Sequence, residues 1–136
     1  MRHLRLRILR LLATLGVVAL IWACNAPFIP VPPPGMITFS AVTVSDGNGG
    51  QKTAWITRGG PNGNAGSARF FVFDTNVGAG VIATAAADGS FVTAPMDGTP
   101  GDQVLINYYL PATGDYSATA CRVLTPDVPD APFCPP

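Results

Sequence analysis

The sequence predicts an all-β domain, an antiparallel sandwich of about seven strands, on three observations. From residue 36 onward, short β-branched or aromatic runs alternate with Gly-, Asn- and Asp-rich turns about every 8–12 residues, a spacing typical of small antiparallel sandwiches. No window of about 11 residues in this part shows the 3.6-residue hydrophobic period of a helix. The 136 residues are enough for one small domain behind an N-terminal signal helix and too few for two.

The expected strands follow one another from residue 36 to residue 124. They lie at residues 36–45, 52–58, 68–75, 81–87, 90–94, 103–110 and 116–124. A Gly/Asn-rich stretch at 59–67 forms a long loop between two of them, and Asp88-Gly89 is a strong two-residue hairpin signal. Seven short strands in about 90 residues are typical of an immunoglobulin-like sandwich.

The core of a domain this small depends on a few large side chains, each buried Phe contributing about 2–3 kcal/mol. Phe-Phe-Val-Phe at 70–73 puts bulk on both faces of one strand, which favours a central strand buried on both sides. An exposed aromatic face used for binding would give the same pattern. The expected core residues are Phe39, Trp55, Phe71, Phe73, Phe91, Val104, Ile106 and Tyr116.

The first 23 residues predict an export signal. Residues 1–10 carry four arginines and no acid, and residues 11–23 form an uncharged apolar run, which is the layout of a secretory signal. This run makes only about 20 Å of helix, against a hydrocarbon core of about 30 Å. An uncleaved anchor is the alternative, since arginine side chains can snorkel.

The apolar run ends in Ile21-Trp22-Ala23-Cys24, which resembles the lipobox of bacterial lipoproteins, although Trp22 stands where a small residue is usual. The resemblance implies that Cys24 becomes the first residue and is acylated with membrane lipid, and several acyl chains anchor a protein stably. Asn25, a residue other than Asp, implies the outer membrane of a Gram-negative bacterium. Ordinary cleavage after Ala26, leaving Cys24 free, is the alternative.

Proline-rich segments flank the expected sandwich at residues 36–124. Residues 24–35 hold the lipidation cysteine and five prolines, and predict a polyproline-like stalk that reaches about 34 Å and holds the domain off the bilayer. Residues 125–136 hold five more prolines and should form no regular structure. In an exported chain, Cys121 and Cys134 are expected to form a disulfide that ties this tail to a strand. A redox or metal-binding pair is the alternative, but the spacing is not C-x-x-C.

The segment 66–124 resembles bacterial transthyretin-like and carboxypeptidase-regulatory-like modules. The motifs that carry the resemblance are FVFD at 71–74, DGSF at 88–91 and a Gly-Asp turn at 101–102 that leads into a strand. The resemblance implies a seven-stranded sandwich with a structural or accessory role and no chemistry of its own.

The charge and residue inventory excludes several function classes. From residue 24 onward there are four basic residues against eight Asp, with no Glu and no His. The negative balance argues against nucleic-acid binding, and the missing imidazole removes every mechanism that needs a histidine. The sequence therefore predicts no enzyme and no cofactor.

Calcium is a weak candidate ligand. Oxygen ligands of the kind that calcium prefers are available in turns, at Asp46, Asn48, Asp97 and Asp102. Asp-Gly and Asn-Gly pairs also serve the backbone geometry of turns, and no turn carries a full calcium-loop motif. Turn formation is therefore the favoured interpretation.

The main expectation is a non-catalytic envelope lipoprotein, a structural or interaction module displayed at a membrane surface. Its partners would be membrane lipid through Cys24 and an envelope protein or glycan. The alternative is a carbohydrate- or calcium-binding module on the same sandwich. The sugar-binding residues would then come from the Gly/Asn loop and from exposed aromatic residues, at Asn62, Asn64, Tyr108 and Tyr109.

Overall fold

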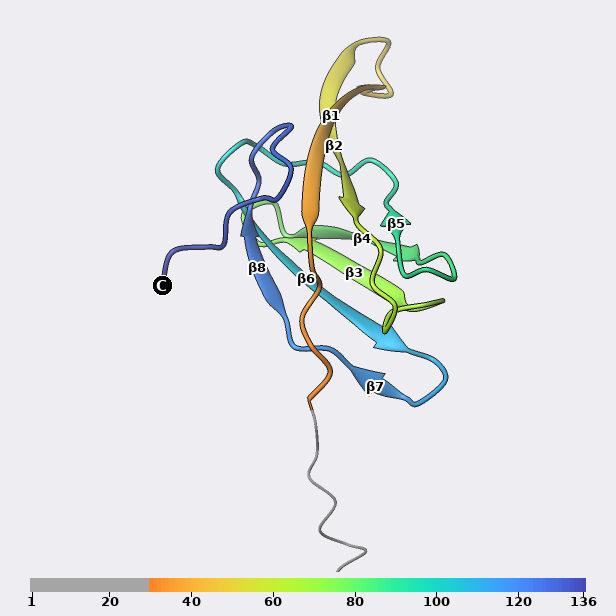
Figure 1. Cartoon of the computed structure of the whole chain (residues 1–136). Coiled ribbons are helices and arrows are strands. Elements are labelled where there is room, and N and C mark those ends of the chain that lie inside the picture. The colour runs from red at the N-terminus through yellow and green to blue at the C-terminus, as the bar shows by residue number, and fades with distance from the viewer. Residues whose placement is uncertain (1–29) are drawn as a thin grey trace, which may run out of the picture.

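A computed structural model describes residues 30–136 as two antiparallel β-sheets packed as a sandwich (Figure 1). Its strands are β1 (Ile37–Ser45), β2 (Gln51–Gly59), β3 (Arg69–Asp74), β4 (Ala79–Thr84), β5 (Phe91–Val92), β6 (Gln103–Leu110), β7 (Asp115–Tyr116) and β8 (Ala120–Val123). One sheet has the order β1-β2-β5, and the five-stranded sheet has the order β4-β3-β6-β7, with β8 also paired to β6. The predicted all-β sandwich is confirmed, with strand orders typical of immunoglobulin-like domains.

The predicted signal segment 1–23 and the predicted lipidation residue Cys24 lie outside the described residues. Within the described part, no helix is long and apolar enough to cross a membrane.

The second half of the expected stalk is attached to the domain. Val31 forms a parallel bridge with Ser117, and its carbonyl oxygen accepts the N–H of Ala118 over 3.1 Å. The Tyr108 hydroxyl donates to the carbonyl oxygen of Pro32 over 3.0 Å. Prolines lack N–H groups but keep carbonyl oxygens that domain donors can satisfy. The expectation of a free stalk through residue 35 is therefore wrong from Val31 onward.

The strands follow the expected ranges closely, except in the last one, which divides into β7 and β8. At the break, the side chain of Ser117 replaces a backbone partner, because the Tyr108 N–H donates to Ser117 Oγ over 2.9 Å. The next residue, Ala118, directs its N–H to Val31 instead of to β6. The sandwich consequently has eight strands where about seven were expected.

The turn at Asp88-Gly89 is present, but it does not join paired strands. Asp88 Oδ1 accepts the N–H of Ser90 over 2.9 Å, and Gly89 has a φ of +82°. The strand before the turn, β4, pairs with β3, whereas β5 after it pairs with β2. The hairpin predicted here is therefore wrong. Turn chemistry reverses the chain, but the choice of partner strand follows from burial of Phe91, whose ring stacks on Phe70 at 3.9 Å between centroids.

The core lies between the two sheets. Five predicted core residues are buried, namely Phe39, Trp55, Phe91, Val104 and Ile106. Phe71 is only half-buried, and Phe73 and Tyr116 are 43% and 61% exposed, so the expectation that they form the core is wrong. Strand residues alternate between faces, and on β3 it is Phe70 and Val72 that face the second sheet. The other face of β3 carries the exposed aromatic side chains that the alternative interpretation anticipated.

The C-terminal tail covers the edge of β1 and joins it to β8. Cys121 and Cys134 form the expected disulfide, with 5.4 Å between Cα atoms. The tail residues Asp127 and Ala131 donate their N–H groups to the carbonyl oxygens of β1 residues Phe39 and Ile37 over 2.9 and 2.7 Å. The tail therefore closes one side of the sandwich without forming a strand of its own.

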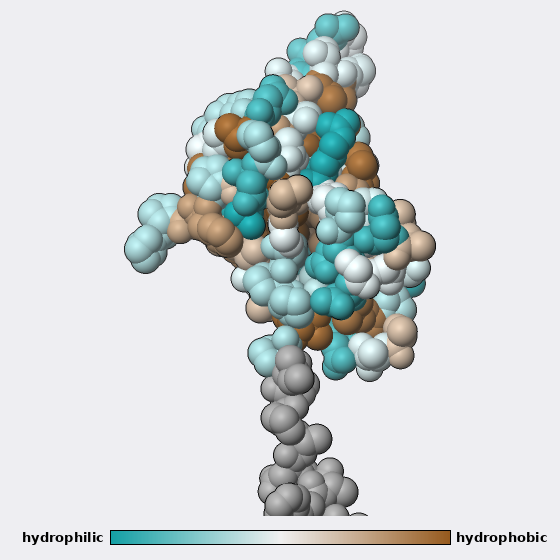
Figure 2. All heavy atoms as spheres, in the orientation of Figure 1, coloured by the Kyte–Doolittle hydropathy of each residue, from teal (hydrophilic) through white to brown (hydrophobic). Residues whose placement is uncertain are grey.

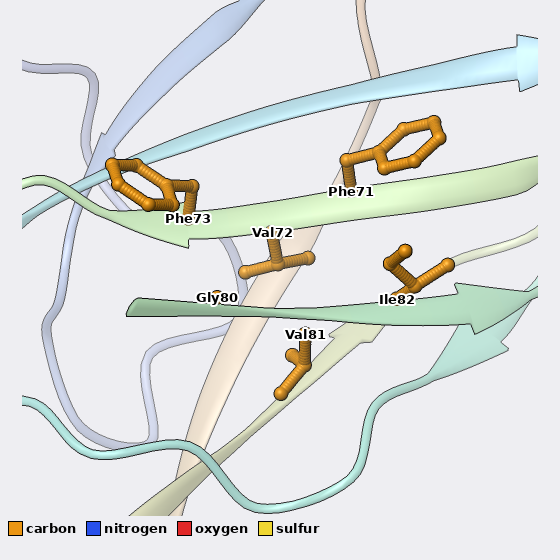
Figure 3. Close-up of a pocket in the computed structure, with 6 residues that line it drawn as sticks. All are labelled: Phe71, Val72, Phe73, Gly80, Val81 and Ile82. Carbon is orange, nitrogen blue, oxygen red and sulfur yellow. The ribbon is translucent and has the colours of Figure 1, made fainter. Parts of the chain in front are cut away.

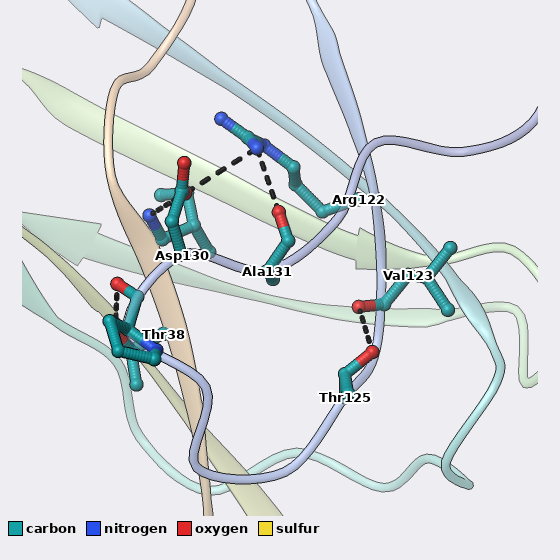
Figure 4. Close-up of polar contacts among 8 residues, drawn as sticks. Thr38, Arg122, Val123, Thr125, Asp130 and Ala131 are labelled. Carbon is teal, nitrogen blue, oxygen red and sulfur yellow. Dashed lines mark hydrogen bonds and ion pairs between the residues drawn. The ribbon is translucent and has the colours of Figure 1, made fainter.

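The guanidinium of Arg122 is buried beneath this tail. Its Nη1 donates to the carbonyl oxygen of Ala131 over 2.7 Å and lies 3.4 Å from the carboxylate of Asp130 (Figure 4). The Phe133 ring lies 3.7 Å from the guanidinium carbon. A buried cation needs partners of this kind, so the tail and Arg122 fix one another.

Candidate functional site

The outer face of the five-stranded sheet is the candidate site. The strand register sets its side chains in rows across β4, β3 and β6, with Ile82 beside Phe71 and Phe71 beside Asn107 in the middle row. Tyr116 on β7 lies opposite Tyr109. We define the outer face by the residues Arg69, Phe71, Phe73, Gly80, Ile82, Thr84, Leu105, Asn107, Tyr109, Tyr116 and Cys121.

Aromatic rings form a connected cluster on the outer face. The centroids of Tyr109 and Tyr116 are 4.9 Å apart, and those of Phe71 and Tyr116 are 6.4 Å apart. The cluster is open to solvent, since Tyr116 in it is 61% exposed and Ile82 beside Phe71 is 64% exposed. The largest exposed apolar patch of a small domain is often functional, so the outer face is the part of the described surface to consider first.

A shallow hollow of about 250 Å³ lies between β3 and β4 on this side of the sheet. Phe71 and Phe73 from β3 and Ile82 from β4 contribute to its lining (Figure 3). The ring of Phe73 leans over Gly80, where a Cβ atom would approach that ring to 3.1 Å and the carbonyl oxygen of Val72 to 2.5 Å. Glycine is thus required at position 80, and Phe73 covers the backbone it leaves bare.

The outer face has a net positive charge, whereas the described domain as a whole has an excess of acidic side chains. Residues 30–136 contain four basic side chains and eight Asp, yet the only charged member of the outer face is Arg69. Asp115 precedes Tyr116 on β7 and so points to the opposite side, and Asp74 at the end of β3 is fully buried. The outer face therefore carries one positive charge and no carboxylate.

Tyr108 and Tyr109 have opposite surroundings. Tyr108 is fully buried, so the expectation that it is exposed for binding is wrong. It faces the core, and burial raises the pKa of its hydroxyl, although a hydrogen bond with the Asn62 side chain lowers it. Tyr109 is half-buried and belongs to the outer face.

The Gly/Asn loop at 59–67 is folded against the domain. The N–H of Asn62 donates to the carbonyl oxygen of Asp88 over 2.9 Å, and Ala65 is fully buried. Asn62 Oδ1 accepts the N–H of Asn64 over 3.1 Å, which closes a local turn. The four candidate sugar-binding residues therefore do not form one site.

The oxygen atoms considered for calcium serve turns and an ion pair. Asp46 Oδ1 accepts the N–H of Asn48 over 2.8 Å, and Asp102 Oδ2 accepts the N–H of Thr99 over 2.7 Å. The carboxylate of Asp97 pairs with Lys52 at 2.7 Å. Residues 30–136 contain no cluster of three or more His, Cys, Asp or Glu side chains that could hold a metal ion.

No protein-family model matches this chain, and comparison with curated proteins and with solved structures found no match. The resemblance of segment 66–124 to transthyretin-like modules stays a prediction, as does the resemblance of residues 21–24 to a lipobox. The functional proposal consequently rests on the geometry of the outer face and on the sequence.

Proposed function

We propose that this protein is a non-catalytic, lipid-anchored envelope module whose outer face is its contact surface. The observation that carries the proposal is the uncovered apolar face itself, on which Phe73, Ile82 and Tyr116 are 43%, 64% and 61% exposed. Single exposed apolar side chains are normal, but a contiguous patch of them often marks a site of interaction. Residues 24–136 also lack histidine and glutamate, which supports a binding role over a chemical one.

The export part of the proposal has support at both ends of the chain. The basic and apolar residues before Cys24 have the layout of a signal. At the other end, Cys121 and Cys134 form a disulfide, and such bonds persist in oxidising compartments outside the cytosol. An exported location accounts for both features.

The mass of the intact protein extracted from membranes tests the anchor. We expect a chain of residues 24–136 that carries diacylglyceryl and N-acyl groups, with no thiol that reacts before reduction. A chain that starts at Pro27 without lipid would contradict the anchor and point to a secreted domain. Retention of residues 1–23 would contradict lipidation and point to an uncleaved membrane anchor.

A glycan is the second candidate partner, because polar donors lie between the aromatic rings of the outer face. Asn107 is the neighbour of Phe71, and Arg69 is the neighbour of Tyr109. Sugars offer an apolar C–H surface to rings and hydroxyl groups to such donors. On a glycan array, Tyr116→Ala should weaken binding about tenfold or more, equivalent to about 1.4 kcal/mol. Val92→Ala is the matched control, since Val92 is 56% exposed on the other sheet.

A further inference from the structure

We infer that the occupant of the outer face is the lipid bilayer, so that the domain lies on the membrane with its five-stranded sheet downward. This inference rests on the proposed lipid anchor at Cys24. It differs from the picture of a module held away from the membrane by a long stalk, and it assigns the exposed aromatic side chains to the headgroup region.

The first support is the short tether. The chain is fixed to the domain at Val31 through the bridge to Ser117 and the hydrogen bond to Ala118. The chain from Cys24 to Val31 therefore has to span the whole distance from lipid to domain, and seven residue steps reach at most about 25 Å when fully extended. The bilayer surface therefore lies within this distance of Val31. This distance is shorter than the reach of about 34 Å expected for a free stalk through residue 35.

The second support is the place where the tether meets the domain. Ser117 and Ala118 follow β7 directly, and β7 is the strand at one end of the order of the five-stranded sheet. In Figure 1, the N-terminal end of the described residues, in orange, lies close to β7. The same strand carries Tyr116, which belongs to the aromatic cluster of the outer face. The tether therefore holds the border of the outer face close to the bilayer.

The third support is side-chain chemistry. Tyrosine suits the membrane–water interface because its ring is apolar and its hydroxyl can stay hydrated. Tyr109 and Tyr116 lie on the part of the outer face nearest the tether, with Phe71 beside them. Ile82 and Phe73 extend the apolar area across β4 and β3, as on other surfaces that insert shallowly into a bilayer.

The fourth support is charge complementarity. A bilayer with anionic lipids attracts Arg and Lys and repels carboxylates near its surface. The outer face offers Arg69 and no carboxylate, although the described domain has an excess of acids. The acids lie elsewhere, for example Asp46 and Asp97 beside the β1–β2 hairpin, and Asp127 in the tail. Viewed from the side of β1, the surface is a mixture of hydrophilic and hydrophobic atoms (Figure 2). An anionic bilayer would therefore favour contact with the outer face.

Two variants of the full chain, each with one added cysteine, test this orientation. The protein is produced in a Gram-negative host that processes lipoproteins and is reconstituted into phosphatidylethanolamine–phosphatidylglycerol vesicles. Ile82→Cys places a fluorophore on the outer face, and the matched Val92→Cys places it on β5, where the original side chain has similar exposure, 56% against 64%. The native thiols do not react, since Cys121 and Cys134 are paired and Cys24 is acylated in the proposed anchor.

We expect spin-labelled lipids to quench the probe at position 82 several-fold more than the probe at 92, and aqueous iodide to show the reverse order. In the otherwise native chain, Arg69→Glu should reduce the quenching at 82 on anionic vesicles, and Arg69→Lys should restore it. Equal quenching at the two positions would overturn the inference. Protection of the probe at position 82 from iodide that depends on protein concentration in detergent would overturn the inference in favour of a second copy of the chain. Protection from iodide that depends on added glycan would overturn it in favour of a glycan.

Vesicle flotation and intact mass separate failure of the orientation from failure of the anchor. An acylated protein that floats with vesicles but quenches equally at both positions leaves the anchor standing and rejects the orientation. A protein that lacks acyl groups and stays at the bottom of the gradient rejects the anchor, and the orientation with it.

Discussion

The two faces of the five-stranded sheet are built from similar residues but have opposite surroundings. On the inner face, Phe70 and Val72 are 2% and 1% exposed. On the outer face, Phe71 is half-buried and Phe73 is 43% exposed, although these residues alternate with the first two along the same strand. The inner face is covered by the second sheet of the same chain, whereas no layer of residues 30–136 covers the outer face. Apolar composition therefore shows that a face needs a partner, and only the fold shows whether that partner is internal.

The largest expected effect comes from truncating one phenylalanine on each face. Phe70→Ala should lower the free energy of unfolding by about 3–5 kcal/mol, because it leaves a cavity in the core where Phe70 contacts the rings of Phe91 and Tyr108. Phe73→Ala should cost about 1 kcal/mol or less, as expected for an exposed site. Urea unfolding of both variants measures the difference. Equal losses would show that the outer face is packed as firmly as the inner one.

The sequence was sufficient for the strands, since turn residues and alternation of side chains mark their ends. It was insufficient to decide which face of β3 is buried, because residues 70–73 are all apolar and therefore put apolar side chains on both faces. The assignment of Phe71 and Phe73 to the core failed for this reason. A shift of one residue exchanges the two faces, and only pairing with β4 and β6 decides it. The assignment of Tyr108 to the surface had a different cause, because Tyr108 lies on β6 and alternates in step with Val104 and Ile106, which were expected in the core.

The rest of the candidate site and its surroundings also depends on contacts between distant segments. Val31 reads as part of a stalk in the sequence, and its attachment becomes visible only with Ser117 beside it. Asp88-Gly89 predicts a turn correctly, but a local motif contains no information on which strand β5 will pair with. The disulfide between Cys121 and Cys134 was predictable because cysteines of a chain that is expected to be exported normally pair.

The second effect concerns the C-terminal tail, which covers the edge of β1. Replacing both Cys121 and Cys134 with serine should lower the free energy of unfolding by about 3 kcal/mol, the chain-entropy value for a loop of this length. The tail should then exchange its amide hydrogens faster at Ala131, which donates to β1. Native-state hydrogen exchange and urea unfolding measure both changes. Unchanged exchange at Ala131 would mean that the hydrogen bonds of the tail to Arg122 and to β1 hold it without the disulfide.

A smaller effect distinguishes the adjacent tyrosines. Burial raises the pKa of Tyr108 from 10.0, so its neutral form stabilises the folded state; this stabilisation is fully present below pH 10.0 and is lost as the pH rises through the folded pKa. Tyr108→Phe should cost about 1 kcal/mol at neutral pH through the lost hydrogen bond, to the carbonyl oxygen of Pro32. It should also flatten the loss of stability in alkali. Tyr109→Phe is the control at neutral pH, where it should change the free energy of unfolding less than Tyr108→Phe. An alkaline slope that Tyr108→Phe leaves unchanged would contradict the raised pKa of the buried Tyr108 hydroxyl.

The smallest effect on stability is expected on the outer face, at Ile82. Ile82→Ser should change the free energy of unfolding by no more than about 0.5 kcal/mol, because the side chain is 64% exposed. The same variant should weaken retention of the lipidated protein on vesicles, and Val92→Ser on the other sheet should not. Calorimetry gives the first quantity and vesicle flotation in high salt the second. A residue that is neutral for folding but required for membrane contact would explain why an exposed isoleucine stands beside Phe71. A large loss of stability in Ile82→Ser would instead mean that the outer face is covered within the full chain, and the contrast between the two faces would no longer hold.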